Sequence, residues 1–340
     1  MNQHRRVNHT KKVVVGLMAA GAVATTAGVL TNSAQAAREG SGDGGTRPAG
    51  AQTASFLPVV DVSNGAVLDL AATARKSGVK HFTLGHIQRG SGCTTEDQDK
   101  AFTGLEKLRR AGGAVQVSFG GDGGDLTPAC SSAERQAAAY AKVIDTHKLN
   151  EADFDVQGFV LNMPDLNARR SQAIARLQKD HPGLRVSFSL PVVSSGLTPN
   201  GVKVLTAAKA KGVDISMVNL VTGNPGAGAT GPDLLKYTTG AANAAHRQIS
   251  AALGLPAAKA WQSIAVTPRI GANDFGERTF TPRDAKGLVA FARSRHLGRL
   301  SMDSINRDKQ CRDSVTDTQC SGVRQKPFAF SKALGSYESR

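Results

Sequence analysis

Cysteine, aromatic residues and long apolar runs are scarce in this sequence of 340 residues, which has 4 cysteines, one tryptophan and 3 tyrosines. So few cysteines exclude a small scaffold built from disulfides. No CxxC pair occurs, so a cysteine-based metal cluster is not indicated. We therefore expect neither a metal nor a cofactor. No run approaches the roughly 18 uninterrupted apolar residues of a membrane span once an N-terminal export signal is set aside, so we expect no transmembrane segment.

Positive charge exceeds negative charge, with 42 Lys and Arg against 27 Asp and Glu and a formal net charge of +15. The cations are dispersed, with no block of five or six, so we expect no nucleic-acid partner. A basic surface facing an anionic cell-wall polymer or an anionic sugar is compatible with this charge, and so is plain solubility. At 40% hydrophobic and 20% charged residues, the chain can bury a full core, which excludes the disordered and fibrous classes.

The first 36 residues have the pattern of a secretory signal peptide. A charged stretch, residues 5–12, precedes a small apolar run, residues 13–30, and Ala34 and Ala36 frame a cleavage site of the small-x-small type. The charged stretch contains an arginine pair, but the residues after it are not the apolar ones that twin-arginine signals favour, so the general route is preferred. We expect a protein that is secreted and extracellular.

Two further parts follow the predicted signal. Residues 37–54 are rich in Gly and Ala without hydrophobic periodicity, which predicts a flexible linker. Residues 55–338 are not interrupted by a second linker, so we expect a single domain. We also expect a monomer. The four cysteines suit two disulfides in an oxidising compartment. Among the three possible connectivities, the local one joins Cys93 to Cys130 and Cys311 to Cys320.

Short β-branched runs alternate with amphipathic stretches throughout the domain. The predicted strands are residues 56–62, 80–84, 114–119, 152–156, 185–190, 214–220, 263–267 and 299–302. The predicted helices are residues 68–77, 97–111, 132–147, 166–180, 199–211, 231–253, 282–296 and 327–334. This alternation predicts an α/β fold of the (β/α)8 TIM-barrel type. The alternative is an open doubly wound sheet, which usually has a glycine-rich phosphate turn after its first strand; residues 61–65 do not form one.

Reactive groups of such barrels lie at the carboxyl ends of the strands. The candidate site residues at those ends are His86, Ser118, Gly120, Gly121, Asp153, Asp155, Gln157, Asn224, Pro225, Arg269 and Asp303. Asp153 and Asp155 have a structural interpretation as buried hydrogen-bond partners within the barrel. Gly120 and Gly121 permit close backbone approach, and His86 taken alone is typical of a satisfied surface histidine.

Two segments carry a resemblance to glycoside hydrolase family 18. Residues 117–121 (VSFGG) resemble its SxGG segment, and residues 153–157 (DFDVQ) lie where that family has DxDxE. Further stretches resemble a bacterial, actinomycete-type branch of its chitinases, and the similarity runs from about residue 56 to residue 330. These stretches are residues 78–84, 180–184, 265–268, 296–302 and 306–311.

The resemblance implies a TIM barrel and a substrate-assisted cleavage of β-linked N-acetylglucosamine, an exception to the two-carboxylate scheme. In such enzymes the final Glu of DxDxE protonates the departing oxygen, while the acetamide carbonyl of the substrate attacks the anomeric carbon. The preceding Asp of the motif orients that acetamide. A Tyr after strand six hydrogen-bonds it, and a Trp after strand eight forms the floor under the strained sugar.

The catalytic motif is degenerate in this chain. Asp153 and Asp155 match the two aspartates, but Gln157 occupies the place of the proton donor. A carboxamide is nearly the size of a carboxylic acid and still forms hydrogen bonds, yet it has no proton to deliver near neutral pH.

The other partners of the reaction are replaced as well. Asn224 and Pro225 occupy the positions of an Asp-Tyr pair, so the acetamide-binding tyrosine is lost, and Asp303 replaces the floor tryptophan. Arg269 stands at a methionine position and His86 at an apolar aromatic position. The proton donor, the acetamide-binding tyrosine and the floor tryptophan are all replaced. The resemblance therefore implies a protein that is inactive as a chitinase.

Several functional hypotheses remain open. The preferred one is non-catalytic recognition of an N-acetylated or anionic glycan at the cell envelope. Its expected binding residues are His86, Ser118, Gly120, Gly121, Asp155, Gln157, Arg269 and Asp303. Such binding needs aromatic platforms, which are scarce here, and Trp261 is expected to pack in the core or against a helix.

Two enzymatic hypotheses are the alternatives. In one, residual or altered hydrolysis of N-acetylglucosamine polymers persists. In the other, the barrel mouth, where the carboxyl ends of the strands meet, has been rebuilt. Its residues His86, Asp153, Asp155, Arg269 and Asp303 would bind a cation or supply a new acid/base pair. The aspartate pair belongs to the inherited scaffold and needs no metal to explain it.

Overall fold

The computed structural model describes residues 55–62, 68–96, 99–223, 233–272, 279–312 and 319–338. The expected signal peptide (1–36) and linker (37–54) lie outside these residues. Asn224 and Pro225 also lie outside them.

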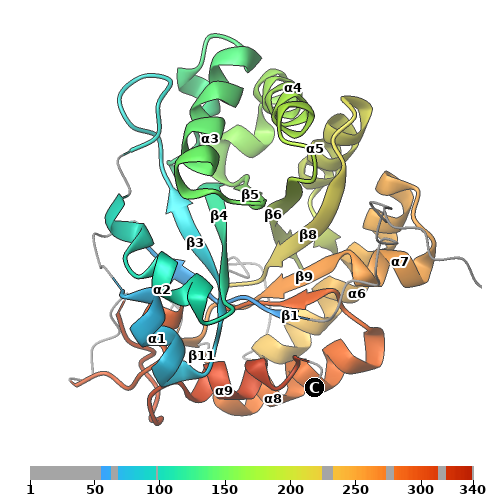
Figure 1. Cartoon of the computed structure of the whole chain (residues 1–340). Coiled ribbons are helices and arrows are strands. Elements are labelled where there is room, and N and C mark those ends of the chain that lie inside the picture. Colours follow the sequence, from blue (N-terminus) through green and yellow to red (C-terminus); the bar gives the residue numbers. More distant parts are fainter. Residues whose placement is uncertain are drawn as a thin grey trace, which may run out of the picture. The chain divides into compact units, whose positions relative to one another are not determined.

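A ring of parallel strands forms the centre of the domain (Figure 1). The parallel strands are β1 (Ser55–Phe56), β2 (Val59–Asp61), β3 (His81–Ile87), β4 (Ala114–Gly120), β5 (Glu151–Asp155), β6 (Arg185–Val193), β8 (Ile215–Val221), β9 (Ile264–Thr267) and β12 (Arg299–Leu300). Their order in the sheet is β1-β12-β9-β8-β6-β5-β4-β3-β2. The first strand is thus split: β1 pairs with the last strand and β2 with β3.

The split strand closes the sheet on itself. Between β1 and β2, the Leu57 N–H donates to the Leu300 carbonyl at 3.0 Å, and the Thr83 N–H donates to the Pro58 carbonyl at 3.0 Å. Pro58 has no N–H to donate, which is consistent with the interruption at this point. Eight parallel strand positions therefore make a closed barrel. The predicted TIM-barrel fold is confirmed, and the alternative prediction of an open doubly wound sheet is wrong.

Helices surround the barrel (Figure 1). The α-helices are α1 (Leu70–Ser77), α2 (Leu105–Arg110), α3 (Ala133–His147), α4 (Pro164–Asp180), α5 (Pro199–Ala210), α6 (Leu234–Leu253), α7 (Ala257–Gln262), α8 (Pro282–Arg295) and α9 (Ala329–Gly335). Single turns of 3-10 helix are η1 (Asp99–Phe102), η2 (Thr127–Ala129), η3 (Gly158–Asn162) and η4 (Ile305–Arg307). The remaining strands are β7 (Gly196–Leu197), which forms a hairpin with β6, and the antiparallel pair β10 (Gly271–Ala272) and β11 (Thr279–Phe280).

The structure differs from the predicted helices in two places. The helix expected over 97–111 is broken into η1 and α2 at Gly104, whose φ is +82°. A Cβ at this glycine would lie 2.6 Å from Oδ1 of Asp69, so the chain needs glycine here and turns sharply. The short helix α7 was not predicted, and it carries Trp261. As expected, Trp261 packs beside helices: its ring stacks on His246 and lies edge-on to Phe291.

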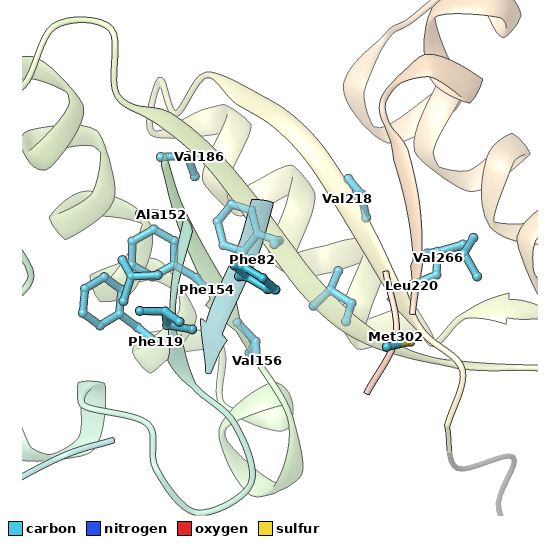
Figure 2. Close-up of a cluster of buried hydrophobic side chains, with 14 of the residues drawn as sticks. Phe82, Phe119, Ala152, Phe154, Val156, Val186, Val218, Leu220, Val266 and Met302 are labelled. Carbon is cyan, nitrogen blue, oxygen red and sulfur yellow. The ribbon is translucent and has the colours of Figure 1, made fainter. Parts of the chain in front are cut away.

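Alternation along the strands separates an apolar outer face of the barrel from a polar interior. On β5, Phe154 contacts the ring of Tyr140 on α3, and on β4 Phe119 contacts the same ring. Figure 2 shows these phenylalanines within a cluster of buried apolar side chains contributed by successive strands. Asp153 and Asp155, the alternate residues of β5, line a cavity inside the barrel instead. The hydrophobic core therefore lies between sheet and helices, and the barrel interior is available for a polar site.

Both predicted disulfides are present, joining Cys93 to Cys130 and Cys311 to Cys320.

Among the helices of the described ranges, none has the length and apolar character needed to cross a bilayer.

Candidate functional site

A cavity of about 90 Å³ lies within the barrel. His86, Gln157 and Asp303 line it near the carboxyl ends of their strands, and Gln116 and Arg299 line it deeper along the barrel. The sequence predicted that polar residues would meet at the carboxyl ends of the strands, and these side chains share one cavity. This volume admits several water molecules, so small polar groups can enter it.

Asp153 anchors the floor of this cavity. Its carboxylate accepts hydrogen bonds from the hydroxyls of Ser118 at 2.7 Å, Ser187 at 2.5 Å and Ser189 at 2.7 Å. Burial raises the pKa of Asp153 to about 6, and the nearby charge of Asp155 adds to this rise, while the three serine donors oppose it. Asp153 is therefore a buried hydrogen-bond partner, as predicted, that joins three neighbouring strands.

The network continues along the barrel interior through residues that the sequence did not single out. Thr267 donates to Asn219 at 2.7 Å, and Asn219 donates to Ser189 at 2.8 Å. On the other side, Arg299 donates to Gln116 at 2.6 Å and to Glu151 at 3.0 Å. One feature of the sequence could have identified these residues: polar side chains recur at alternate positions of strands whose other residues are apolar.

Asp155 is held by two side chains at the mouth. Nε2 of Gln157 donates to both carboxylate oxygens, at 2.8 and 2.7 Å, and Nε2 of His86 lies 2.7 Å from Oδ2. The Asp155 side chain is only 4% exposed. The carboxamide thus turns toward the aspartate that the family resemblance associates with the acetamide. As with Asp153, the buried structural role expected for Asp155 is found.

His86 has a hydrogen-bond partner, as expected for it taken alone, but it lies at the edge of the cavity rather than on the open surface, with its side chain 31% exposed. Its ring is partly buried against Asp155 and lines the cavity. Burial by itself lowers the pKa of His86, but the hydrogen bond that its ring donates to Asp155 and the charges of Asp155, Asp303 and Asp153 outweigh it and raise the pKa to about 9. The ring is consequently an imidazolium at neutral pH.

The titration of His86 gives the first prediction. We expect its ring to stay protonated through neutral pH and to lose its proton as the pH rises through about 9. Because the folded-state pKa is raised, the stabilisation from the His86–Asp155 pair is fully present below about pH 6.5 and is lost above about pH 9. NMR titration of the ring, assigned with His86→Gln, measures this. Asp155→Asn should lower the pKa, and a midpoint near 6.5 in the unaltered protein would contradict the pairing.

Arg269 and Asp303 meet at the rim of the barrel. Nη1 of Arg269 donates to Oδ2 of Asp303 at 3.3 Å, and the two residues also form an isolated parallel bridge. Asp303 lines the cavity with its side chain 38% exposed, whereas Arg269 is held beside it. The position where the resemblance implies an aromatic floor is therefore occupied by an ion pair.

Gly120 and Gly121 allow the loop after β4 to approach the site closely. Their φ angles are +104° and +76°. A Cβ at Gly120 would collide with the carbonyl oxygen of Asp155, and one at Gly121 would lie 2.7 Å from the ring of His86. The expected close backbone approach is confirmed, and it is what leaves room for His86 beside Asp155.

Oxygen and imidazole groups at the mouth also raise the question of a metal. Within the described ranges no group of three or more His, Cys, Asp or Glu side chains is arranged to hold an ion. The oxygens of Asp153 and Asp155 already accept hydrogen bonds from serine, glutamine and histidine donors. These two carboxylates are therefore engaged with donors of the protein itself.

Individual known proteins, rather than a family model, show what this chain is related to. No family model matches the chain. Endochitinase 11 of Metarhizium anisopliae is 30% identical over 275 residues, covering 74% of this chain and 52% of that protein. A probable bifunctional chitinase/lysozyme of Escherichia coli (strain K12) is 30% identical over 279 residues, covering 74% of this chain and 31% of that protein.

A solved structure supports the same relationship. The catalytic domain of a hyperthermophilic chitinase from Pyrococcus furiosus superposes with a TM-score of 0.74 at 27% identity, covering 84% of this chain and 95% of that one. The chain is a chitinase-like protein of glycoside hydrolase family 18. This family 18 chitinase-like protein spans about half the length of the fungal relative and about a third of the bacterial one. Its DxDxE-like segment ends on Gln157, at the mouth of the barrel.

Proposed function

We propose that this protein recognises an N-acetylated glycan at its barrel mouth without hydrolysing it. The observation that carries the proposal is the state of Gln157, whose carboxamide donates to both oxygens of Asp155 and stands where the family resemblance implies the proton donor. A carboxamide has no proton to give to a departing oxygen near neutral pH. General acid catalysis contributes roughly 10²–10⁴ in rate, so its loss removes a large part of any hydrolytic activity.

The mouth still offers groups that suit an acetamido sugar. Gln157, Asn219, His86, Asp155 and Asp303 all line the cavity, and a bound ligand would share or replace the hydrogen bonds that the first four make within the protein. Amides and carboxylates together satisfy both the N–H and the C=O of an acetamide. The cavity of about 90 Å³ matches such a group rather than a whole oligosaccharide, whose remaining rings would lie across the rim.

Calorimetry with the β-1,4-linked hexamer of N-acetylglucosamine tests the proposal. The unaltered protein should release heat, and Asp155→Ala should weaken binding by about tenfold or more, because a charge-assisted hydrogen bond contributes about 1.5–3 kcal/mol. Asp145→Ala is the matched control, since Asp145 is 64% exposed on α3 and pairs with His181. Absence of heat from the unaltered protein would sink the proposal, as would equal weakening by the control.

A second candidate function is altered hydrolysis, favoured by one observation. His86 has a raised pKa of about 9 and lines the cavity, so a protonated group is present there at neutral pH. Its proton is directed to Asp155, however, and a donor with so high a pKa is poorly matched to proton transfer near neutral pH. Product release that disappears in His86→Gln but persists in Gln157→Ala would favour this candidate.

The protein's location belongs to the same proposal. The signal-like residues 1–36 and the two disulfides both support export to an oxidising compartment, followed by action at the cell envelope or in the medium.

A further inference from the structure

Three large apolar side chains are exposed in segments that follow or end two neighbouring strands of the barrel. Among the described residues, the large hydrophobic side chains that are exposed are Phe159 (61%), Met163 (46%) and Val193 (41%). Phe159 and Met163 follow β5, and Val193 ends β6, the neighbouring strand. These strands run parallel with Asp155 opposite Ser189, so all three side chains belong to the carboxyl edge of the barrel. A large apolar side chain left exposed at this edge is a candidate for ligand contact, because the proposed site opens at the same edge.

Phe159 also lines a second cavity beside the first. This cavity has a volume of about 70 Å³, and Arg89, Asp125 and Gln157 are among its other lining residues. Gln157 lines both cavities, so they adjoin at this side chain. The exposed ring therefore lies next to Gln157, at the edge of the cavity in which the proposed glycan would place its acetamide.

The segment that presents Phe159 is firmly held. In η3 the two residues after Phe159, Val160 and Leu161, are buried, at 2% and 8% exposed. The side-chain amide of Asn167 donates to the Leu161 carbonyl at 3.1 Å, and Asn200 on α5 donates to the side chain of Asn162 at 2.7 Å. A ring presented by a fixed turn loses little conformational freedom when a ligand covers it.

We propose that Phe159 is a stacking platform for a pyranose ring of a β-1,4-linked N-acetylglucosamine oligosaccharide, one ring away from the sugar at Gln157. The inference rests on the proposed glycan recognition and adds the residue that supplies its apolar contact. An aromatic face complements the apolar face of a pyranose, and the guanidinium of Arg89 on the same cavity has donors for sugar hydroxyls. Met163 and Val193 have no flat face and line neither cavity.

Binding of the N-acetylglucosamine hexamer to matched variants tests the platform. Phe159→Ala should weaken binding by about tenfold, whereas Phe159→Trp should bind at least as tightly as the unaltered protein. Met163→Ala is the control, since it removes exposed apolar surface from the same part of the chain without removing a ring. Unchanged melting temperatures establish that the variants are folded.

A fluorescence readout locates the contact. Trp261 is the single native tryptophan, so Phe159→Trp combined with Trp261→Phe reports from position 159 alone. Its emission should shift on addition of the hexamer. Hexamer binding that Phe159→Ala leaves unchanged, or that Met163→Ala weakens equally, overturns the platform while glycan recognition stands. Failure of the unaltered protein to bind overturns both.

Discussion

Cleavage of a soluble chito-oligosaccharide by this protein is expected to be slower than by a family 18 chitinase with glutamic acid at the corresponding position by at least about 10²–10⁴-fold, the range that general acid catalysis alone contributes. The physical reason is that Gln157 donates its amide hydrogens to Asp155 and carries no transferable proton. Chromatographic detection of shortened oligomers at neutral pH measures the rate. Turnover in the range of ordinary chitinases, abolished by Asp155→Ala, would contradict the expectation.

Gln157→Glu is the informative control in that experiment. On the proposed function we expect it to stay within about tenfold of the unaltered protein, because the acetamide partner and the stacking floor that the family resemblance implies are absent as well. Pro225 still lacks the hydroxyl for the acetamide, and Asp303 still forms an ion pair with Arg269 where a stacking floor is implied. Recovery of a hundredfold or more would show that the single carboxamide accounts for the loss.

Removal of the Asp125 carboxylate is expected to cost about 3–5 kcal/mol in the free energy of unfolding, because it leaves a buried guanidinium unpaired. Asp125 and Arg170 lie 2.6 Å apart with side chains 7% and 2% exposed. Arg170 also donates to Asn167, the residue that holds η3. Urea unfolding of Asp125→Ala measures the loss.

The matched control is an exposed ion pair on the same helix as Arg170. Arg176 and Asp180 lie 3.6 Å apart on α4, and both side chains are more than half exposed. Asp180→Ala should therefore cost less than about 1 kcal/mol. Equal losses in Asp125→Ala and Asp180→Ala would show that burial does not govern the strength of these pairs.

The barrel itself could be predicted because its physical pattern is local. In Asp153-Phe154-Asp155, alternate residues face the polar interior and the apolar helix layer, and this period of two marks a strand wherever it falls. The break at Gly104 could not be predicted from periodicity, because it depends on the contact with Asp69, which is distant in the sequence.

The site was predicted as a set of residues but not as a set of contacts. Strand ends identified His86, Asp155 and Gln157 as candidates, yet the pairing of His86 with Asp155 joins β3 to β5 across an intervening strand. The exposure of Phe159 could not be predicted from the sequence. It begins an apolar run with Val160 and Leu161, in which the sequence does not tell the exposed residue from the two buried ones.

The most direct test of the central claim is a crystal structure with the N-acetylglucosamine hexamer bound. The claim is that the group facing the bridging oxygen carries no acidic proton. The predicted result is that Gln157 gives up one of its two hydrogen bonds to Asp155 and places its amide nitrogen about 2.7–3.2 Å from that oxygen, with no carboxyl group as close. Contact between the bridging oxygen and a carboxyl of Asp303 or Asp153 would contradict the account, because either group would then be placed to act as an acid.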